Sequence, residues 1–426
     1  MHIQKLKLER YRGARSLSIS LHRNLNIFVG MNGAGKSSIL DSAAILLSWL
    51  VNRIKSATAS GKPILEADIM NGEFSANVIL TLDIDSATYR WNIAKNRKNT
   101  PYKEASSDLS ELSTLAKNIR SECLEPDQQA KLPLFVYYPV NRSVLDIPLR
   151  IRGKHRFDLL SAHEQAFSGG VNFRSFFEWF REREDLENEA RRDQDALFHL
   201  NNTATYPDPQ LEAVRKALSQ FMPEFQNLTV RRSPLRMEVE KNGRTLTVNQ
   251  LSDGEKCLMA LIGDMARRLA IANPGHENPL EGKGIFLIDE IDLHLHPIWQ
   301  QILVPRLNIV FPKCQFLITT HSPHVITHVP PENLFLLEMA KEGLILNEAS
   351  ESYGKTVERV LEDLMGMDTT RPKQVDHDIK EIFRQINDGN LQQAKQAIQA
   401  LEKSIGADPE LIRANILIKR KELIGK

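Results

Sequence analysis

The segment Gly30–Ser37, Gly-Met-Asn-Gly-Ala-Gly-Lys-Ser, constrains the fold of this 426-residue chain more than any other. It has the spacing G-x-x-x-x-G-K-[ST] and follows the apolar run Leu25–Val29, which predicts a buried strand. A helical pattern begins directly after it, at Ser38. In this context backbone N–H groups converge on a phosphate, and the helix dipole favours its negative charge. The sequence therefore predicts a nucleoside triphosphate site at the edge of an α/β fold.

Individual residues of this loop have distinct predicted roles. Lys36 is expected to reach the outer phosphates, and the Ser37 hydroxyl is expected to ligate Mg²⁺. The other loop residues expected to contact the nucleotide are Asn32, Gly33, Ala34, Gly35 and Ser38. ATP and Mg²⁺ are therefore the predicted substrate and cofactor.

Composition narrows the class of protein. Apolar residues make up 42% and charged residues 26%, which is ordinary for a globular chain, and a net charge of +1 does not indicate a nucleic-acid binder. Three widely spaced cysteines suit a reducing cytoplasm better than a disulfide framework. The N-terminus lacks the apolar core of a signal peptide, and no segment has the roughly eighteen consecutive apolar residues of a membrane span. We expect a cytoplasmic protein without membrane contact.

Periodicity divides the chain into four predicted regions. Strand patterns surround the phosphate loop, so residues 1–150 are expected to form a first ATPase lobe. The highly charged stretch 151–225 is expected to be a helical insertion. Helices alternate with strands over 226–350, as a parallel sheet requires, and residues 351–426 are expected to form an all-helical tail.

A second motif, Leu-Ser-Asp-Gly-Glu, stands immediately before a predicted helix over 254–272. Its residues are Leu251, Ser252, Asp253, Gly254 and Glu255. Alone the pentapeptide is weak evidence, because serine followed by acidic residues also makes an ordinary helix cap. Its position between the phosphate loop and two further motifs gives it weight.

Two predicted strands end in polar residues suited to phosphate chemistry. The strand Ile285–Ile288 is followed by Asp289 and Glu290, and ligands sit at the C-terminal ends of strands in an open parallel sheet. Asp289 can hold Mg²⁺ through water, and Glu290 can polarise an attacking water. A later strand over 315–320 precedes His321, which could contact the γ-phosphate. Glu290 and His321 are the predicted catalytic residues.

The order of these motifs resembles that of the ABC-type ATPase heads. The resemblance implies that residues 251–255 of one subunit close over the nucleotide held by the phosphate loop of another. ATP would then join two heads, and hydrolysis would release them. Asp289-Glu-Ile-Asp292 resembles the Asp-Glu-x-Asp of SMC-like and repair ATPases. Tyr11-Arg12-Gly13 resembles their N-terminal turn, in which the arginine approaches the nucleotide.

Two later stretches narrow the resemblance to the overcoming-lysogenization-defect (OLD)-like ATPases of phage defence. They are Leu293-His-Leu-His-Pro297 and Thr319-Thr-His-Ser-Pro323. His296 occupies the place of an aspartate usual in ABC heads, and no glutamine stands clearly where their Q-loop should be. Members often carry a fused Toprim nuclease, but the only late Asp-x-Asp, Asp376-His-Asp378, has a helical context. We expect no nuclease activity within this chain.

The whole outline resembles the PtuA family, the ATPases of Septu anti-phage systems, which also accompany some retrons. The implied fold class is an α/β ABC-type head with a helical insertion and an all-helical C-terminal tail. The implied function is a slow ATPase that forms a homodimer or larger oligomer and controls a separate HNH nuclease of the PtuB type through residues 351–426. A retron reverse transcriptase and msDNA would be further partners. The alternative is a RecF-type or SMC-like repair ATPase that clamps or loads on DNA.

Two further patterns leave alternatives open. DNA could contact basic residues of the helical regions, although charges interleaved with acids are usually a solvated face. These residues are Arg181, Arg183, Arg191, Arg192 and Lys419-Arg420-Lys421. Four histidines could be drawn as a zinc site, but such sites usually include cysteine or carboxylate. They are His294, His296, His321 and His324.

Overall fold

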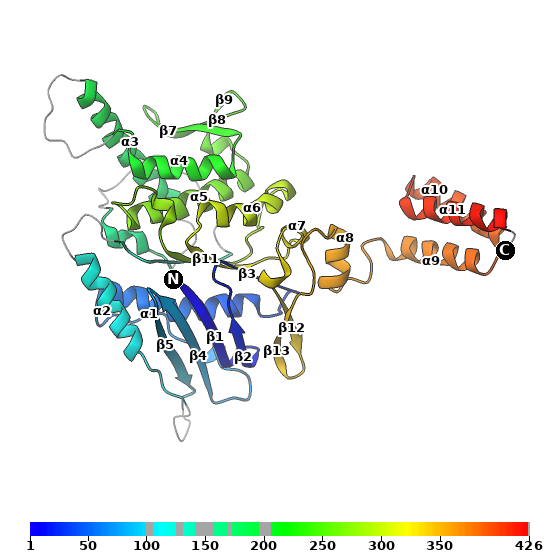
Figure 1. Cartoon of the computed structure of the whole chain (residues 1–426), viewed down its shortest axis with the longest axis horizontal. Helices are drawn as coiled ribbons and strands as arrows, with labels where there is room; N and C mark the ends of the chain where they lie inside the picture. The colour runs from blue at the N-terminus through cyan, green and yellow to red at the C-terminus, as the bar shows by residue number, and fades with distance from the viewer. Residues whose placement is uncertain (99–104, 125–130, 141–156, 168–172, 196–205, 425–426) are drawn as a thin grey trace. The chain divides into compact units, whose positions relative to one another are not determined.

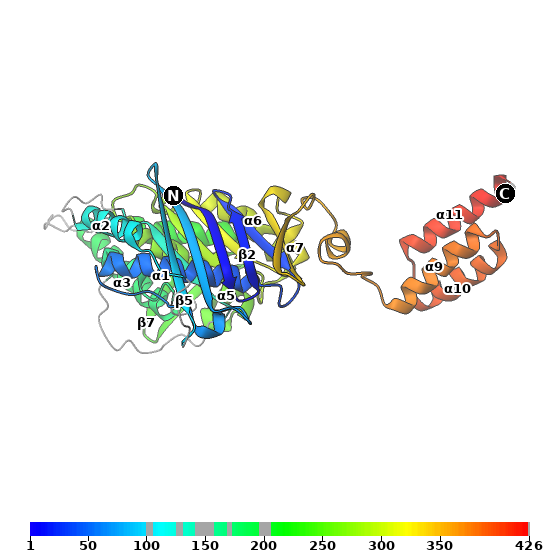
Figure 2. The same cartoon turned by 90° about the horizontal axis from the view of Figure 1, so that it is seen from below.

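Helix α1 (Lys36–Lys55) is the centre of the nucleotide-binding unit, and strand β3 (Leu25–Gly30) leads into it. Buried residues lie on almost every side of α1, and the helix contacts strands of two different sheets. A helix that is apolar all round is stable only when it is buried. Figures 1 and 2 show α1 running between these sheets, and the phosphate loop leads directly into this buried helix.

The computed structural model describes residues 1–98, 105–124, 131–140, 157–167, 173–195 and 206–424. They form two compact units, Met1–Lys355 and Thr356–Lys426. The first boundary of the four predicted regions, at 150/151, lies outside the described residues. The four-region division itself stays a prediction.

The first sheet is antiparallel, with strand order β2-β1-β4-β5. Its strands are β1 (His2–Tyr11), β2 (Ala14–Ser20), β4 (Ser75–Ile84) and β5 (Ala87–Asn96). Buried and half-buried residues alternate along β4, as expected of a strand with one face against α1. Two predicted strands before the phosphate loop and the predicted strand pair after it are confirmed.

The second sheet carries the predicted catalytic motifs and has strand order β13-β12-β3-β11-β10-β6. All neighbours are parallel except β13, which closes a hairpin with β12. The other bounds are β6 (Leu134–Tyr138), β10 (Gly284–Ile288), β11 (Cys314–Thr319), β12 (Leu334–Ala340) and β13 (Gly343–Glu348). Every residue of β6, β10 and β11 is buried, which explains why these strands are mostly apolar, apart from Gln315 and Thr319 in β11.

Helices and a small antiparallel sheet complete the first unit (Figure 1). The helices are α2 (Ser110–Leu124), α3 (Phe173–Asp195), α4 (Pro209–Phe221), α5 (Asp253–Ala272), α6 (Pro297–Val310) and α7 (Pro323–Ile326). The sheet consists of β7 (Phe225–Arg232), β8 (Leu235–Lys241) and β9 (Arg244–Thr247). The predicted helix over 173–200 is present to Asp195, and 196–200 lie outside the described residues.

A buried ion network joins α5 to β6. Asp264 accepts hydrogen bonds from the Tyr138 hydroxyl at 2.9 Å, from Arg267 Nη2 at 2.6 Å and from Arg268 Nε at 2.7 Å. Burial alone would raise the pKa of Asp264, but the charges of Arg268 and Arg267 outweigh it and hold the pKa at about 2. The network fixes the middle of the helix that begins at the Leu-Ser-Asp-Gly-Glu motif.

The second unit, described by itself, is a helical tail. Its main helices are α9 (Lys373–Asn387), α10 (Leu391–Ile405) and α11 (Pro409–Ile424), preceded by the short α8 (Val357–Arg359). Apolar side chains of the three long helices bury one another, among them Ile382, Ile398 and Ile418. Asp376 lies in the first turn of α9 and Asp378 follows in the same helix, as the helical context of this pair predicts.

The predicted fold class, an α/β ATPase head with a helical insertion and a helical C-terminal tail, is confirmed. Within the described residues, no helix combines the length and the apolar character needed to span a bilayer.

Candidate nucleotide-binding site

The phosphate loop joins the end of β3 to the start of α1. Gly33 and Gly35 have φ values of 82° and 85°, in the left-handed region that favours glycine. No side chain caps the first turn of α1, and that turn contains no acidic residue. Its N–H groups and the positive end of its dipole therefore favour an anion. Asn32, Gly33 and Ser37 are exposed around this helix start.

The remaining loop residues support the turn from inside. Ala34 is buried, and its N–H donates to Met31 O at 3.1 Å. The N–H of Ser38 donates to Gly35 O at 3.0 Å, which closes the first turn of the helix. These contacts hold the loop in one conformation before any nucleotide contact is made.

The Lys36 ammonium lies across the loop. Its Nζ donates to Gly30 O at 2.9 Å and to Met31 O at 3.0 Å, and the residue is only 6% exposed. Burial lowers the pKa of Lys36 from its ordinary value, while the charges of Glu290 and Asp289 act in the opposite direction. This lysine is thus positioned between the loop and the carboxylates of the next motif.

Three parallel strands bring the other motifs to the same edge. Ile27 of β3 is level with Ile318 of β11, which is level with Ile288 of β10. The residues that follow these strands, the phosphate loop, His321 and Asp289-Glu290, therefore leave the sheet side by side. The sequence predicted this convergence from the strand-end positions alone.

Asp289 and Glu290 are held by the neighbouring strand. Asp289 is 3% exposed and accepts a hydrogen bond from the Thr319 hydroxyl, whose oxygen in turn accepts the Glu290 N–H at 2.7 Å. Glu290 has a φ of 46°, which is uncommon for a residue with a side chain and costs roughly 1–2 kcal/mol. The sequence did not indicate the role of Thr319, because the contact joins residues thirty positions apart.

The charges of Lys36, Asp289 and Glu290 also act on His321. Burial, and next the positive charge of Lys36, lower its pKa from the ordinary value of 6.5, and the carboxylates of Glu290, Asp292 and Asp289 oppose them. His321 is therefore neutral at pH 7. A neutral imidazole can donate one hydrogen bond and accept another, as contact with a phosphate and a water requires.

The second motif forms the N-terminus of α5. The Ser252 hydroxyl accepts the Glu255 N–H at 3.4 Å, and the Glu255 carboxylate accepts the Ser252 N–H at 2.7 Å, which is a capping box. Glu255 is buried and also pairs with Lys241, whereas Ser252 and Asp253 are exposed. Leu251 is buried beneath the turn.

Gly254 packs against the backbone of the turn that follows β10. A Cβ at Gly254 would lie 2.3 Å from the carbonyl oxygen of His294, so only glycine allows the two backbones to approach this closely. Among the described residues, no hydrogen bond or ion pair joins 251–255 to Gly30–Ser38 of the same chain. The structure therefore does not bring the second motif and the phosphate loop together within one chain.

Arg12 lies beside α1 rather than free at the loop. It has a φ of 49° in the turn between β1 and β2. Its Nη1 contacts Asp41 at 2.7 Å and its Nε contacts Asp68 at 2.9 Å. Asp41, one helical turn after Ser37, also accepts the Tyr137 hydroxyl at 2.9 Å. A role for Arg12 at the nucleotide stays a prediction.

The donor set fits Mg²⁺. A serine hydroxyl at the helix start and a carboxylate at the end of the adjoining sheet are oxygen ligands of the kind that Mg²⁺ prefers. Ser37 is exposed, and Asp289 is buried and oriented by Thr319.

His296, one of the four histidines considered for a zinc site, caps α6 by accepting the Ile298 N–H at 3.3 Å. Within the described part of the chain, no three His, Cys, Asp or Glu side chains cluster as a metal site.

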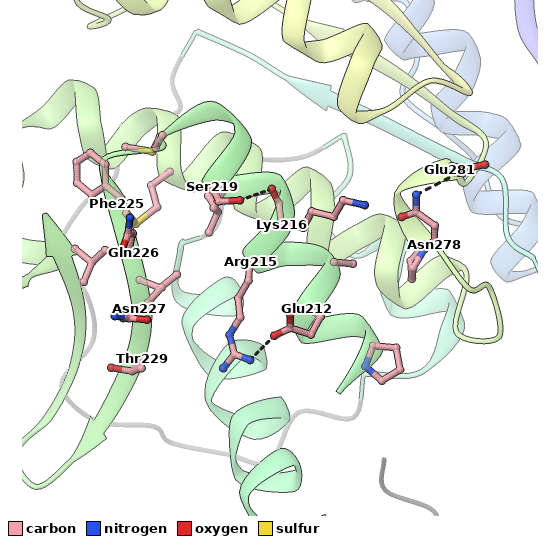
Figure 3. A pocket seen from close by; sticks show the side chains of 18 of the residues that line it. Glu212, Arg215, Lys216, Ser219, Phe225, Gln226, Asn227, Thr229, Asn278 and Glu281 are labelled. Carbon is pink, nitrogen blue, oxygen red and sulfur yellow. Dashed lines mark hydrogen bonds and ion pairs between the residues drawn. The ribbon is translucent and has the colours of Figure 1, made fainter. Parts of the chain in front are cut away.

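A separate cavity of about 1210 Å³ lies between α4, the start of β7 and residues 276–281. Figure 3 shows Glu212 bonded to Arg215 on α4, and Asn278 bonded to Glu281 on another part of the lining. None of the residues that line it belongs to the predicted nucleotide site. Its lining mixes acidic, basic and apolar side chains, which indicates no single class of ligand.

Comparisons with known proteins give the family of this chain. A protein family described as "AAA domain, putative AbiEii toxin, Type IV TA system" matches residues 25–327. The chain is 32% identical to the Retron Ec83 probable ATPase of Escherichia coli over 393 residues, 79% of this chain and 72% of that protein. It is 32% identical to the Retron Vc95 probable ATPase of Vibrio cholerae, over 80% of this chain and 74% of that protein.

A third relative matches along nearly its whole length. The chain is 25% identical to the Septu protein PtuA of Bacillus thuringiensis over 414 residues, 94% of this chain and 93% of that protein. Among solved structures, the SMC head domain from Thermotoga maritima has a TM-score of 0.45 at 17% identity, covering 82% and 100% of the two chains. Because that TM-score is low, the fold assignment depends on the strand order and the phosphate loop instead.

The predicted resemblance to PtuA is confirmed by these relatives, of which the Septu protein PtuA covers 94% of this chain. The family match spans the phosphate loop, the Leu-Ser-Asp-Gly-Glu motif, Asp289-Glu290 and His321. The chain therefore belongs to this AAA-domain family, in which it is a PtuA-type ATPase.

Proposed function

We propose that this chain binds and slowly hydrolyses ATP, and that ATP joins two or more copies of it into an assembly controlling a separate HNH nuclease. The observation that carries the proposal is the convergence of Lys36, Asp289-Glu290 and His321 at one edge of the parallel sheet. The relatives named for Septu and retrons support a role in anti-phage defence.

Binding begins at the helix N-terminus. The N–H groups of Gly33–Ser38 surround the β- and γ-phosphates, and Asn32 and Ala34 shape the loop around them. The Lys36 ammonium exchanges its contacts with Gly30 O and Met31 O for phosphate oxygens. Because a charge-assisted bond replaces two bonds to neutral carbonyls, ATP is favoured over nucleotides that lack the outer phosphate.

Hydrolysis depends on Glu290. Its carboxylate accepts a proton from the water that attacks the γ-phosphate, and neutral His321 holds that phosphate or water by a hydrogen bond. Ser37 and Asp289 would hold Mg²⁺, which would supply charge stabilisation for the phosphate oxygens. Turnover is slow because the closed state has to open before products leave.

Assembly follows from the exposed second motif. Ser252 and Asp253 point to solvent at a helix N-terminus, where a second copy's bound triphosphate can be contacted. Neither chain then has a complete site alone. Nucleotide binds the closed pair more tightly than the open one, and this difference in affinity drives assembly.

We propose that the helical tail holds the nuclease. The alternative, in which the chain clamps DNA, is not favoured by the contacts of two basic residues in α3. Arg181 and Arg183 in α3 pair with Asp185 and Asp208. Residues neutralised in this way contribute little to binding of a phosphate backbone. Contact with DNA through Lys419 or Arg420 stays a prediction, tested by whether duplex affinity falls steeply with salt.

Two variants test the ATPase part. Glu290→Gln is expected to bind ATP, to lower kcat by about 10²–10⁴-fold, and to accumulate an ATP-dependent assembly visible by light scattering. Lys36→Ala should weaken ATP binding by roughly 10- to 150-fold, the loss of one charged hydrogen bond. Glu277→Gln, the same charge change at an exposed position far from the motifs, is the control. Wild-type turnover in Glu290→Gln would falsify the base assignment.

The partner is tested by co-expression with an HNH nuclease encoded beside this gene. Purification of both proteins together from wild type, and loss of the nuclease from a chain truncated after residue 355, would support control through the tail. Recovery of the nuclease with the truncated chain would contradict it. An adjacent DNA-repair operon in place of a nuclease gene would favour the RecF-type alternative.

A further inference from the structure

Thr319 ends β11 beside Asp289 and Glu290, the two acidic residues that follow the neighbouring strand β10. Its hydroxyl donates to Asp289 Oδ1 and accepts the N–H of Glu290 at 2.7 Å. Its carbonyl oxygen accepts the N–H of Ile291 at 3.0 Å. The residue is fully buried, so water cannot replace these contacts. One threonine therefore contacts three consecutive residues at the catalytic end of β10.

The direction of each hydrogen bond follows from the groups involved. A backbone N–H can only donate, so the Thr319 oxygen must accept from Glu290. The hydroxyl proton is then directed to Asp289 Oδ1, which accepts it. The single hydroxyl of Thr319 therefore acts as a donor toward Asp289 and as an acceptor toward Glu290.

The backbone of Glu290 also needs support. Its φ of 46° is a left-handed conformation that persists only when the surroundings hold it. The bonds from Thr319 to the N–H groups of Glu290 and Ile291 flank this residue on both sides. The turn separates the two carboxylates, because Asp289 is buried whereas Glu290 is partly exposed.

We propose that Thr319 is a positioning residue that orients Asp289 for the cation and Glu290 for the attacking water through one hydroxyl group. The proposal rests on the proposed ATPase function of this site. The neighbouring Thr320 does not share the role, since its hydroxyl donates to Asp292 instead.

The test compares Thr319→Val, which keeps the branched shape and removes the hydroxyl, with Thr319→Ser, which keeps the hydroxyl. Thr327→Val is the matched control, because Thr327 is also buried and its hydroxyl bonds only near α7. Loss of a residue that orients a metal ligand typically costs 10–100-fold in metal affinity or activity. We expect Thr319→Val to lower kcat by about this factor and to raise the Mg²⁺ concentration for half-maximal turnover.

A binding measurement separates positioning from general damage. The affinity for the fluorescent analogue mant-ATP is measured with EDTA and with Mg²⁺. Thr319→Val should keep its metal-free affinity within about two-fold and lose most of the gain given by Mg²⁺, while Thr319→Ser and Thr327→Val should resemble wild type. If Thr319→Val does not fold, Thr319→Ala replaces it in the same comparison.

Equal impairment of Thr319→Ser and Thr319→Val overturns the proposal, as does an unchanged Mg²⁺ dependence in Thr319→Val. These outcomes are distinct from failure of the proposed function. If Glu290→Gln turns over like wild type, only the base assignment of Glu290 fails; if the wild-type chain neither binds nor hydrolyses ATP, the proposed function fails and this inference fails with it. If Glu290→Gln and Lys36→Ala behave as expected while Thr319→Val is unaffected, only the role of Thr319 is wrong.

Discussion

Replacement of Asp264 by asparagine tests how the helix behind the second motif is anchored. Asparagine has nearly the same volume, so Asp264→Asn creates no cavity, but it removes the negative charge and replaces one acceptor oxygen by an NH₂ group that can only donate. Arg267 and Arg268, which are 3% and 2% exposed, then remain in the interior without their carboxylate. Removal of one partner from a buried ion network typically costs about 3–5 kcal/mol.

The pKa of Asp264 gives a lower bound on this loss. The difference between its ordinary value of 3.8 and the folded value of about 2 corresponds to roughly 2 kcal/mol. Because the folded pKa is lowered, this stability is present above pH 3.8 and is lost as pH falls toward 2. We therefore expect Asp264→Asn to lose roughly 2–5 kcal/mol at pH 7.

Urea unfolding followed by tryptophan fluorescence measures the loss. All four tryptophans lie within Met1–Lys355, so the fluorescence reports the unit that contains Asp264. Tyr138→Phe is the matched control, because it removes one hydrogen bond from Asp264 and should cost only about 1.5–3 kcal/mol. A loss in Asp264→Asn below about 2 kcal/mol would refute the reasoning, because it would show that the two arginines find other partners.

Two further changes have expected outcomes. Gly254→Ala should destabilise the first unit by about 1–3 kcal/mol in the same urea assay, because contact with the His294 backbone outweighs a helix-propensity gain of at most about 1 kcal/mol. Unchanged or increased stability would contradict the close approach. Since burial and Lys36 lower the pKa of His321, the acid limb of kcat/KM should have its midpoint below pH 6.5, and a midpoint above that value would refute a neutral His321 as the titrating group.

The sequence predicted best those elements whose start, end or burial is determined by residues close together in the chain. The glycines of the phosphate loop, the proline that begins α4 and the proline that begins α6 mark their helix starts directly. The continuous apolar runs of β10 and β11 identified buried parallel strands, and their ends located Asp289 and His321. Because β10 and β11 are neighbours in the sheet, Asp289 and His321 then lie at the same edge of it.

The contacts that the sequence could not predict join distant residues. Thr319 bonds Asp289 across two strands, and Arg12 bonds Asp41 and Asp68, which are 29 and 56 positions away. Threonine at the end of a strand and arginine in a turn are common, so neither residue type nor spacing marks these pairs. The partner of a polar side chain depends on which elements become neighbours, and that is decided by packing of the whole unit.

The closed apolar cluster of the helical tail has a consequence for substitutions at its surface. Because α9, α10 and α11 bury their own core within Thr356–Lys426, the fold of the tail is maintained by residues such as Ile382 and Ile398. Exposed positions on α11, including Ile412 and Ile416, are under no such constraint from that core. Surface substitutions can therefore change the chemistry of the tail without disturbing the core that holds its fold.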